Sequence, residues 1–415
     1  MKVAVVGAGV SGLVAAHLLH DRHDVTVFEA GAYAGGHTNT ITVETETGSH
    51  EVDTGFIVFN DRNYPRFEAL LDRLRVASQP AQMSFGVSDG AGFEYASTSL
   101  NGLYASRGNL LRPAFHRMIA EVPRFQRAAR ELLASDAEPS LRDWLGGLGL
   151  SEHFVERLIV PQAAAVWSAD PAQMWSFPAR FLVRFFDNHG MLGLTGRPSW
   201  KTVTGGSRSY VHALTAPFEH RIRLSTPVEA IERHVDSVSV RPRGGEPEHF
   251  DEVVVAAHAD QALAMLAEPT ALERELLGAF PYQPNEAVLH TDRSLLPRRR
   301  RAWASWNYHL LAERSGPPTV TYDMNRLQSL DADRELCVTL NHTAAIDPAT
   351  IIRTIAYAHP VYTGEGQRAQ ARHGEVSGAD RIHYCGAYWG WGFHEDGVAS
   401  AHRVVDALER QAVPA

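Results

Sequence analysis

Near the start of the chain, glycines and one acid stand at a spacing that can hold a dinucleotide. Gly7-Ala8-Gly9-Val10-Ser11-Gly12 is a GxGxxG pattern, and Glu29 stands 17 positions beyond its last glycine. Gly7 permits a tight turn, Gly9 lets the backbone approach a diphosphate, and Gly12 lets a helix and a strand pack closely. The Glu29 carboxylate can accept hydrogen bonds from ribose hydroxyls and disfavours a 2′-phosphate. The pattern predicts a dinucleotide site that excludes NADP.

The elements around these glycines are the ones that position such a site. The apolar run Val3–Val6 predicts a strand buried on both faces, and residues 24–28 predict a second one. Residues 13–19 read as the helix between them. Val10 and Ser11 would open this helix, whose free N–H groups and positive dipole end face the phosphates. In this setting the glycine pattern is a strong signal.

The residues after Glu29 distinguish NAD from FAD. A double glycine, Gly35-Gly36, follows shortly after Ala30 and precedes His37 and Thr38. This arrangement resembles the FAD-binding amine oxidase superfamily, which includes monoamine oxidases, phytoene desaturases and protoporphyrinogen oxidases. That family typically has an arginine where this chain has His37, so the resemblance implies FAD with one weaker phosphate contact.

The resemblance implies further cofactor contacts along the whole chain. Gly55 lies in a stretch, residues 53–60, that resembles the turn beside the isoalloxazine ring; a buried hairpin edge is the alternative. Neither Cys337 nor Cys385 resembles a flavin attachment context, so we expect non-covalent FAD. The implied cofactor-binding residues are Gly7, Gly9, Val10, Ser11, Gly12, Glu29, Ala30, Gly35, Gly36, His37, Thr38, Gly55, Phe56, Ile57, Val228, Ala257, Gly386, Ala387, Glu395, Asp396, Gly397 and Val398.

Two residues are candidates for catalysis. His394 ends an aromatic cluster that begins at Tyr388, and a histidine there could relay a proton at neutral pH. Core packing of the cluster is the alternative. Lys201 is the second candidate, because relatives hold a lysine near the flavin, although usually from another segment of the chain. Placement of Lys201 on the surface is the alternative. The histidines do not fall at a metal-ligand spacing, so we predict no metal site.

The positions of these motifs predict the fold and its domains. We expect an α/β fold with a Rossmann-like FAD-binding domain, made of residues 1–63, 205–272 and 375–415. An α+β substrate domain would be inserted as residues 64–204, mostly helical, and 273–374, rich in strands. The two-domain arrangement follows because cofactor motifs stand at the start, middle and end of the chain.

Composition limits the location and the partners. The chain has 415 residues, with 39 basic and 48 acidic side chains, and the formal net charge of -9 argues against a nucleic-acid partner. Two distant cysteines suggest a reducing compartment. With neither a signal peptide nor a long apolar segment, we expect a cytoplasmic protein. The arginine run 298–301 reads as a solvated loop or as a peripheral contact with anionic lipid headgroups.

Taken whole, the chain resembles a bacterial branch of FAD/NAD-binding oxidoreductases similar to the N-terminal domain of plant cyclopropane fatty acid synthases. Residues 35–40, 53–60, 302–308 and 385–390 carry this resemblance. It implies a dehydrogenase, desaturase or isomerase that acts by hydride transfer at flavin N5 on a fatty acyl or other apolar substrate. It also implies a fatty-acid-modifying methyltransferase as a partner.

Two other functions stay open at this point. One is an amine oxidase that produces imine and hydrogen peroxide, and the other is an accessory flavoprotein subunit of a lipid-modifying enzyme. The acyl hypothesis requires an apolar cavity, for which residues 175–194 offer a wall, with Arg180 and Arg184 placed to meet a carboxylate or headgroup. An ordinary helix packed on the core is the alternative. Sequence leaves the substrate, the electron acceptor and the oligomeric state open.

Overall fold

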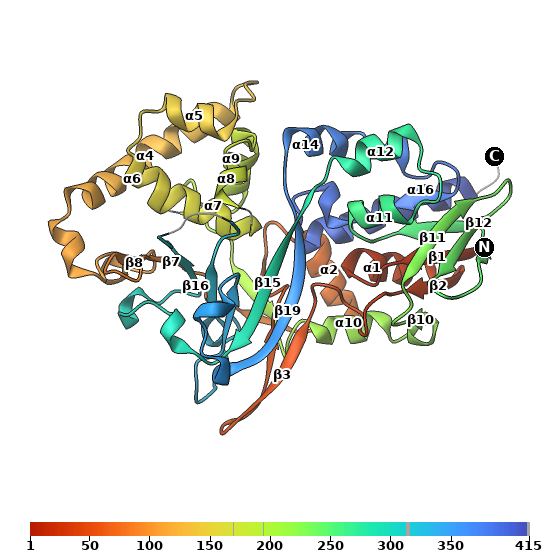
Figure 1. Cartoon of the computed structure of the whole chain (residues 1–415), viewed down its shortest axis with the longest axis horizontal. Helices are drawn as coiled ribbons and strands as arrows, with labels where there is room; N and C mark the ends of the chain where they lie inside the picture. Colours follow the sequence, from red (N-terminus) through yellow and green to blue (C-terminus); the bar gives the residue numbers. More distant parts are fainter. Residues whose placement is uncertain (169, 194, 313–315, 413–415) are drawn as a thin grey trace.

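A computed structural model describes residues 1–168, 170–193, 195–312 and 316–412. A five-stranded parallel sheet lies at the end of the molecule that holds both termini (Figure 1). Its strand order is β10-β2-β1-β14-β20. The strands are β1 (Lys2–Val6), β2 (Asp24–Phe28), β10 (Ile222–Arg223), β14 (Glu252–Val255) and β20 (Ile382–Tyr384). They come from three separate stretches of the chain, as a discontinuous nucleotide-binding fold requires.

The central strand β1 is buried on both faces, which explains its unbroken apolar run. Val3 and Val5 pack towards one layer of helices, and Ala4 and Val6 pack towards the opposite layer. The first layer contains α1 (Val10–Leu19), α2 (Pro65–Leu74), α10 (Arg208–Thr215) and α16 (His394–Ala412). The second contains α11 (Ala259–Met265), α12 (Ala271–Gly278), α14 (Gly364–Ala371) and α15 (His373–Val376), with the small sheet of β11 (Val228–Arg233), β12 (Val238–Pro242) and β13 (Glu248–Phe250).

A seven-stranded mixed sheet forms the middle of the molecule. Its order is β19-β15-β18-β17-β16-β7-β8, and all pairs are antiparallel except β16 with β7. The long strands β15 and β19 run between the two halves of the molecule in Figure 1. The strands are β7 (Phe85–Ser88), β8 (Glu94–Ala96), β15 (Tyr282–His290), β16 (Trp306–His309), β17 (Val320–Asp323), β18 (Cys337–Leu340) and β19 (Ile351–Pro360).

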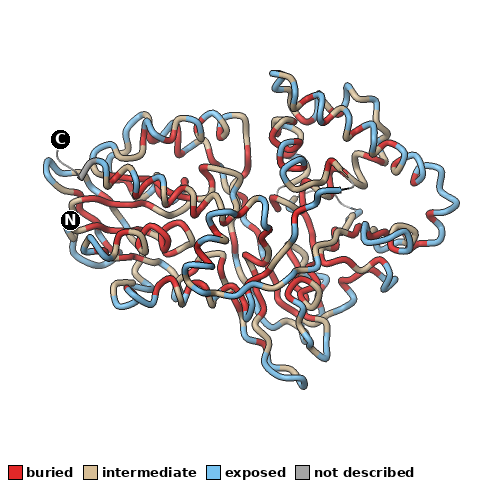
Figure 2. The backbone as a smooth tube through the Cα atoms, turned by 180° about the vertical axis from the view of Figure 1, so that it is seen from behind, coloured by how far each residue is buried: buried red, intermediate tan, exposed pale blue. Residues whose placement is uncertain are grey.

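Helices cover this sheet at the end farthest from the termini (Figure 1). They are α3 (Leu100–Leu103), α4 (Pro113–Leu133), α5 (Leu141–Gly147), α6 (Glu152–Phe154), α7 (Val160–Trp167), α8 (Pro171–Met174) and α9 (Ala179–Asn188). A π-helical turn, Val155–Ile159, joins α6 to α7. Figure 2 shows buried chain inside both halves, and the largest core joins these helices to the seven-stranded sheet.

Two small sheets connect the halves. β3 (Thr40–Thr45) and β4 (Gly48–Asp53) form a hairpin, and β9 (Trp200–Val203) pairs with both β5 (Phe59–Asn60) and β6 (Ser78–Pro80). The Rossmann-like α/β fold with a second, strand-rich unit is therefore confirmed. The domain limits stay a prediction; β5, in the predicted FAD-binding domain, pairs with β9, in the predicted substrate domain. Among the described residues, no helix is long and apolar enough to cross a membrane.

Candidate functional site

One large cavity, of about 1210 Å³, runs from the glycine-rich loop after β1 into the helical half of the molecule. Seventeen of the predicted site residues line it, drawn from the start, middle and end of the chain. They are Gly7, Gly9, Val10, Ser11, Glu29, Ala30, Gly35, Gly36, His37, Gly55, Phe56, Ile57, Val228, Ala257, Gly386, Ala387 and His394. The cavity thus collects the segments that the sequence motifs singled out.

The nucleotide end of the cavity is made of closely packed backbone. A Cβ on Gly12 would lie 1.9 Å from the Gly7 carbonyl oxygen, and one on Gly7 would lie 2.8 Å from the Ala256 carbonyl oxygen. A Cβ on Gly9, in contrast, would meet nothing within 4 Å. Gly9 caps α1 without a side-chain hydrogen bond, so the first N–H groups of the helix face this open space. The loop is therefore a cradle that fits a diphosphate.

Glu29 stands at the edge of this cradle in a fixed orientation. Its Oε2 accepts a hydrogen bond from the Ala8 N–H and its Oε1 accepts one from the Gly31 N–H, each at 2.7 Å. Each carboxylate oxygen keeps a further lone pair that a ribose hydroxyl can use. The Gly35 N–H donates to the Ala8 carbonyl at 2.7 Å, which holds the double glycine against the same loop. These residues fit the dinucleotide part of FAD.

Six predicted cofactor residues are absent from the cavity lining and serve the packing around it. Glu395 accepts hydrogen bonds from the N–H groups of Arg66 and Phe67 at the start of α2, and Asp396 accepts one from Phe393. A Cβ on Gly397 would lie 2.7 Å from Val10, so this glycine lets α16 approach α1. The six residues are Gly12, Thr38, Glu395, Asp396, Gly397 and Val398.

His37 lines the cavity inside a cluster of rings that sequence reasoning missed. Its ring stacks on Tyr357 with centroids 4.7 Å apart, and His359 and His258 lie 5.2 Å and 6.1 Å away. Its Nε2 is buried without a hydrogen-bond partner among the described residues. Burial, followed by the three neighbouring histidines His359, His258 and His394, holds its pKa well below the usual value. A neutral ring with a vacant nitrogen therefore replaces the arginine usual in the family.

Alternation along β19 was the signal that could have found the neighbours of His37. Tyr357 and His359 are two residues apart in a strand, and side chains at that spacing share one face of a sheet. Tyr357 is held in place because its hydroxyl contacts Thr54 Oγ1 at 3.0 Å and accepts from Asn39 Nδ2 at 3.2 Å. Burial lowers the pKa of His359 to about 4, so this ring is neutral as well.

His394 lines the cavity, but its contacts differ from those expected of a proton relay. Its ring stacks face to face on Phe56 with centroids 3.5 Å apart. Its Nε2 lies 3.0 Å from Thr38 Oγ1 and 3.1 Å from the Tyr210 hydroxyl. Burial lowers the pKa of His394 to about 3, so the imidazole does not titrate near neutrality. We correct the relay expectation on this ground: the geometry suits a residue that positions Phe56.

Lys201, the second candidate for catalysis, is absent from the described residues that line the cavity. Its Nζ donates to Glu68 Oε1 at 2.6 Å, in a half-buried ion pair. Its neighbour Trp200 does line the cavity, and successive side chains of a strand point to opposite faces. The structure therefore does not support a catalytic role for Lys201; its ion pair instead joins β9 to α2.

The distal end of the cavity is walled by side chains from many elements. The two acidic residues of the cavity lining, Glu29 and Glu229, lie in the nucleotide-binding half, so none of the described lining residues at the distal end is Asp or Glu. His189 is neutral because burial lowers its pKa to about 4. Arg197 is exposed at the rim and has no ion pair among the described residues. The apolar and aromatic part of the lining is Met83, Phe85, Val166, Trp167, Phe185, Met191, Trp200, Trp306, Tyr322 and Leu340.

The predicted wall at residues 175–194 is built differently from expectation. The chain turns at Pro178, and α9 begins only at Ala179. Of the phenylalanines in this stretch, Phe185 lines the cavity, while Phe177, Phe181 and Phe186 are buried in the core. Arg180 does not reach a cavity ligand, because its guanidinium donates to the carbonyls of residues 133 and 135. The packed-helix alternative is correct for most of the stretch.

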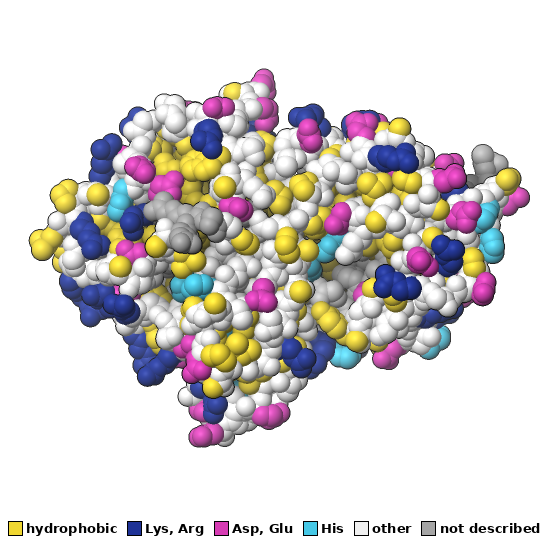
Figure 3. All heavy atoms as spheres, in the orientation of Figure 1, with side chains coloured by type: hydrophobic (Ala, Val, Ile, Leu, Met, Phe, Trp, Pro, Cys, Tyr) yellow, Lys and Arg dark blue, Asp and Glu magenta, His cyan; other side chains and the backbone are white. Residues whose placement is uncertain are grey.

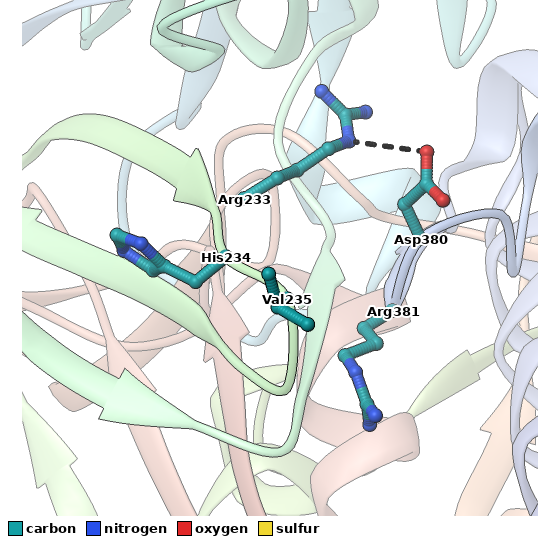
Figure 4. Close-up of a pocket in the computed structure, with 5 residues that line it drawn as sticks. All are labelled: Arg233, His234, Val235, Asp380 and Arg381. Atoms are coloured by element: carbon teal, nitrogen blue, oxygen red, sulfur yellow. Dashed lines mark ion pairs between the residues drawn. The ribbon is translucent and has the colours of Figure 1, made fainter.

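A second hollow, of about 660 Å³, lies beyond the small sheet of the nucleotide-binding half (Figure 4). It is lined by Arg233, His234, Val235, Asp380 and Arg381. Arg233 is committed to carboxylates, since it pairs with Asp380 at 3.7 Å and with Glu273. No predicted site residue lies here. Among the described residues, no group of three or more His, Cys, Asp or Glu is arranged to hold a metal ion.

Comparisons with known proteins agree with this geometry. The model of the family described as flavin containing amine oxidoreductase matches residues 10–316. The fold is similar to that of cyclohexylamine oxidase from Brevibacterium oxydans IH-35A, with a TM-score of 0.72 and 16% identity over 99% of both chains. It is also similar to putrescine oxidase bound to putrescine, with a TM-score of 0.69 and 16% identity over 100% of both chains. A CLA-producing fatty acid isomerase from P. acnes has a TM-score of 0.68 and 17% identity over 99% of this chain and 98% of its own.

Proposed function

This chain belongs to the family of flavin-containing amine oxidoreductases and is an FAD-dependent oxidoreductase, and from that premise we propose that its substrate is a fatty acyl chain or a similarly apolar molecule. The reaction class is a dehydrogenation, desaturation or isomerisation. We also propose that FAD is bound without a covalent link, since Cys385 is buried outside the cavity lining.

The apolar distal wall is the observation that supports this substrate. A hydrocarbon gains about 0.8 kcal/mol for each CH₂ it buries, and Phe85, Val166 and Met191 offer such a surface. An ammonium substrate would need a carboxylate or a comparable partner there, and none of the described distal lining residues is acidic. Arg197 at the rim is suited to an anionic group at the end of the chain.

The residues of the chain itself divide the work between binding and orientation. Gly9 and Glu29 would hold the diphosphate and the ribose of FAD, which supplies the capacity to accept and return two electrons. Phe56, fixed by the ring of His394, forms part of the cavity wall. Tyr357, anchored by Thr54, keeps the ring of His37 in place. An apolar wall disfavours water at the reacting position.

An amine substrate is the second candidate, because a group of aromatic rings lines the cavity. Tyr362, Trp391 and Phe393 line it, and Trp391 stacks on Phe181 with centroids 4.2 Å apart. Such rings can enclose an uncharged amine or attract a cation. The two candidates therefore differ in what the distal end must hold: a long chain in the first case and only a small group in the second.

The test is anaerobic reduction of the purified FAD protein by acyl lipids and by amines, followed as loss of the flavin absorbance. We expect bleaching by unsaturated acyl lipids, and more slowly by shorter acyl chains. Val166→Trp, which fills the distal end, should slow this bleaching by more than tenfold and leave FAD bound, while Val235→Trp in the remote second hollow should change neither. Bleaching by amines alone, undisturbed by Val166→Trp, would reject the acyl substrate. Bleaching by neither class, with activity restored by a fatty-acid-modifying methyltransferase, would indicate an accessory subunit.

A further inference from the structure

Three leucines stand out from the surface within a short segment at the end of the molecule far from the termini. Leu100 is 78% exposed, Leu110 is 50% exposed and Leu111 is 87% exposed. Leu100 begins α3, and the other two end the 3₁₀ turn Arg107–Leu111. Large apolar side chains so exposed and so close in sequence are unusual on a protein that stays free in water.

Arginines surround these leucines. Residues 95–120 contain Arg107, Arg112 and Arg117 and no acidic residue. The arginine run 298–301 packs beside α3, since a Cβ on Gly102 would lie 3.4 Å from the Arg301 carbonyl oxygen. Figure 3 shows the two kinds of side chain together at this end, where dark blue and yellow spheres are neighbours. The surface is therefore basic and apolar at once, on a chain whose net charge is -9.

The members of the arginine run have different partners. Arg299 pairs with the buried carboxylate of Glu94, and Arg300 lies 3.5 Å from Glu335. Arg298 and Arg301 are exposed and have no ion pair among the described residues. Arg107 donates to the neutral side chain of Asn101 and to the Tyr104 carbonyl. Arg112 likewise donates to the neutral side chain of Asn109, so four guanidinium groups at this surface have no ion pair among the described residues.

The segment is anchored to the fold beneath it. Ser106 Oγ donates to the Gly92 carbonyl at 2.7 Å, and Asn109 Nδ2 donates to the Glu94 carbonyl at 3.2 Å. Glu94 also holds Arg299, so one buried residue ties the leucine segment and the arginine run together. The leucines are consequently presented by a fixed scaffold, which reduces the entropy lost when they insert into another phase.

This surface adjoins the distal end of the cavity. Ser97 lines the cavity and is itself exposed, so the cavity reaches the surface at this residue. Leu100 follows three positions later. The N–H of Ser97 donates to the Phe85 carbonyl at 2.9 Å, which places the apolar distal wall directly behind the exposed segment.

We propose that residues 97–112 and 298–301 form a docking surface for a bilayer that contains anionic phospholipids. The leucines enter the boundary between headgroups and acyl chains, and the arginines bind lipid phosphates, to which a guanidinium is well matched. Because the whole chain is acidic, the attraction acts only through this surface and orients the molecule with Ser97 towards the lipid. Binding of the bilayer does not depend on which reaction the protein catalyses. Entry of an acyl chain from the bilayer through the opening at Ser97 does rest on the proposed function.

The test is sedimentation of the FAD protein with vesicles of phosphatidylcholine alone and with vesicles that also contain phosphatidylglycerol. We expect binding to the mixed vesicles that weakens as salt is added. Arg298→Gln with Arg301→Gln should weaken it on the order of thirtyfold. Leu110→Gln and Leu111→Gln should each weaken it about tenfold. Arg274→Gln with Arg403→Gln, which removes the same charge from the exposed surface of the nucleotide-binding half, serves as the matched control and should bind like the parent.

Several outcomes would overturn the docking surface. These are protein that stays in the supernatant with every vesicle, or binding that the control pair weakens as much as the Arg298 and Arg301 pair does. If another protein binds this surface and vesicles do not, the surface is a docking site for a protein partner instead. Flavin bleaching by acyl lipids in detergent is measured separately, so loss of vesicle binding and failure of the proposed activity are distinguishable.

Discussion

The two ends of the cavity hold a ligand with different parts of the chain. At the nucleotide end, Gly7, Gly9 and Gly36 bring bare backbone to the ligand, and Glu29 adds one carboxylate in a fixed orientation. At the distal end the wall consists of side chains from β7, α7 and α9, which lie far apart in sequence. Backbone contacts tolerate almost no added atom, whereas a side-chain wall tolerates exchanges of similar volume.

The largest effect is expected when one methyl group is added to the backbone at the nucleotide end, which should lower the stability of the fold. In Gly12→Ala the new Cβ would lie 1.9 Å from the Gly7 carbonyl oxygen, and both atoms belong to packed backbone. We expect the free energy of unfolding to fall by about 3 kcal/mol or more. Urea unfolding of the protein without FAD measures it.

Gly9→Ala is the matched variant, because a Cβ there meets nothing within 4 Å. We expect its free energy of unfolding to stay within about 0.5 kcal/mol of the parent. Its affinity for FAD should fall more than a hundredfold, since the methyl group occupies the space next to the helix N–H groups that would bind phosphate. Unchanged FAD affinity in Gly9→Ala would contradict the cradle.

The contrast between the two ends also explains how far the sequence could be interpreted. The strand Val3–Val6, the glycines after it and Glu29 are neighbours in sequence, so their spacing alone predicts the turn, the helix and the ligand. The predicted wall at residues 175–194 does contribute Phe185 and Met191, but Trp306 of β16 and Val166 of α7 join them only through the fold, and no local spacing predicts that meeting. Glu395 shows the opposite error: a motif position taken as a cofactor contact instead caps α2, because sequence spacing gives no side-chain direction.

The second prediction concerns acid and the buried histidines, which lie in both halves of the molecule. In the nucleotide-binding half, burial lowers the pKa of His373 to about 4 and that of His394 to about 3. Burial lowers the pKa of His189, His290, His309 and His359 to about 4. In the unfolded chain each titrates at about 6.5, so below that pH the unfolded state binds more protons and the folded state loses stability. At about pH 5 one such histidine costs about 2 kcal/mol. Asp53 acts in the opposite direction, since burial raises its pKa to about 6.

Urea unfolding at neutral pH and at about pH 5 should show this loss, and hydrogen exchange should show it in the seven-stranded sheet, which holds His290, His309 and His359. His290→Gln with His309→Gln should reduce the loss, because these rings contact Thr339 and Thr321 within that sheet. A loss of protection confined to the parallel sheet, with the seven-stranded sheet unchanged, would contradict the role given to His290 and His309.

The third prediction concerns the one side chain on which the nucleotide end relies. Glu29→Ala should weaken FAD binding more than tenfold, since each hydrogen bond to a charged acceptor contributes on the order of 1.5–3 kcal/mol. The variant also leaves the N–H groups of Ala8 and Gly31 without their acceptor, so the protein without FAD should unfold at lower urea. Fluorescence titration with FAD measures the first effect. Glu29→Gln, which keeps one acceptor oxygen, should fall between parent and alanine; an alanine variant as tight as the parent would make the acid purely structural.

The smallest effect is expected at Lys201. It tests which face of β9 lines the cavity and which face supports α2. The ion pair of Lys201 with Glu68 joins β9 to α2 at 2.6 Å, with the lysine side chain 35% exposed. Half-exposed pairs of this kind contribute about 0.2–1 kcal/mol, so Lys201→Met should lower the free energy of unfolding by no more than that. The rate of flavin bleaching by substrate should stay unchanged, because the side chain lies on the face of β9 opposite to Trp200. Trp200→Leu is the contrasting variant, since it alters the wall itself and should change the bleaching rate with little effect on FAD affinity. A large loss of bleaching in Lys201→Met, with folding intact, would show that the lysine acts at the reacting site. The cavity would then include the other face of β9.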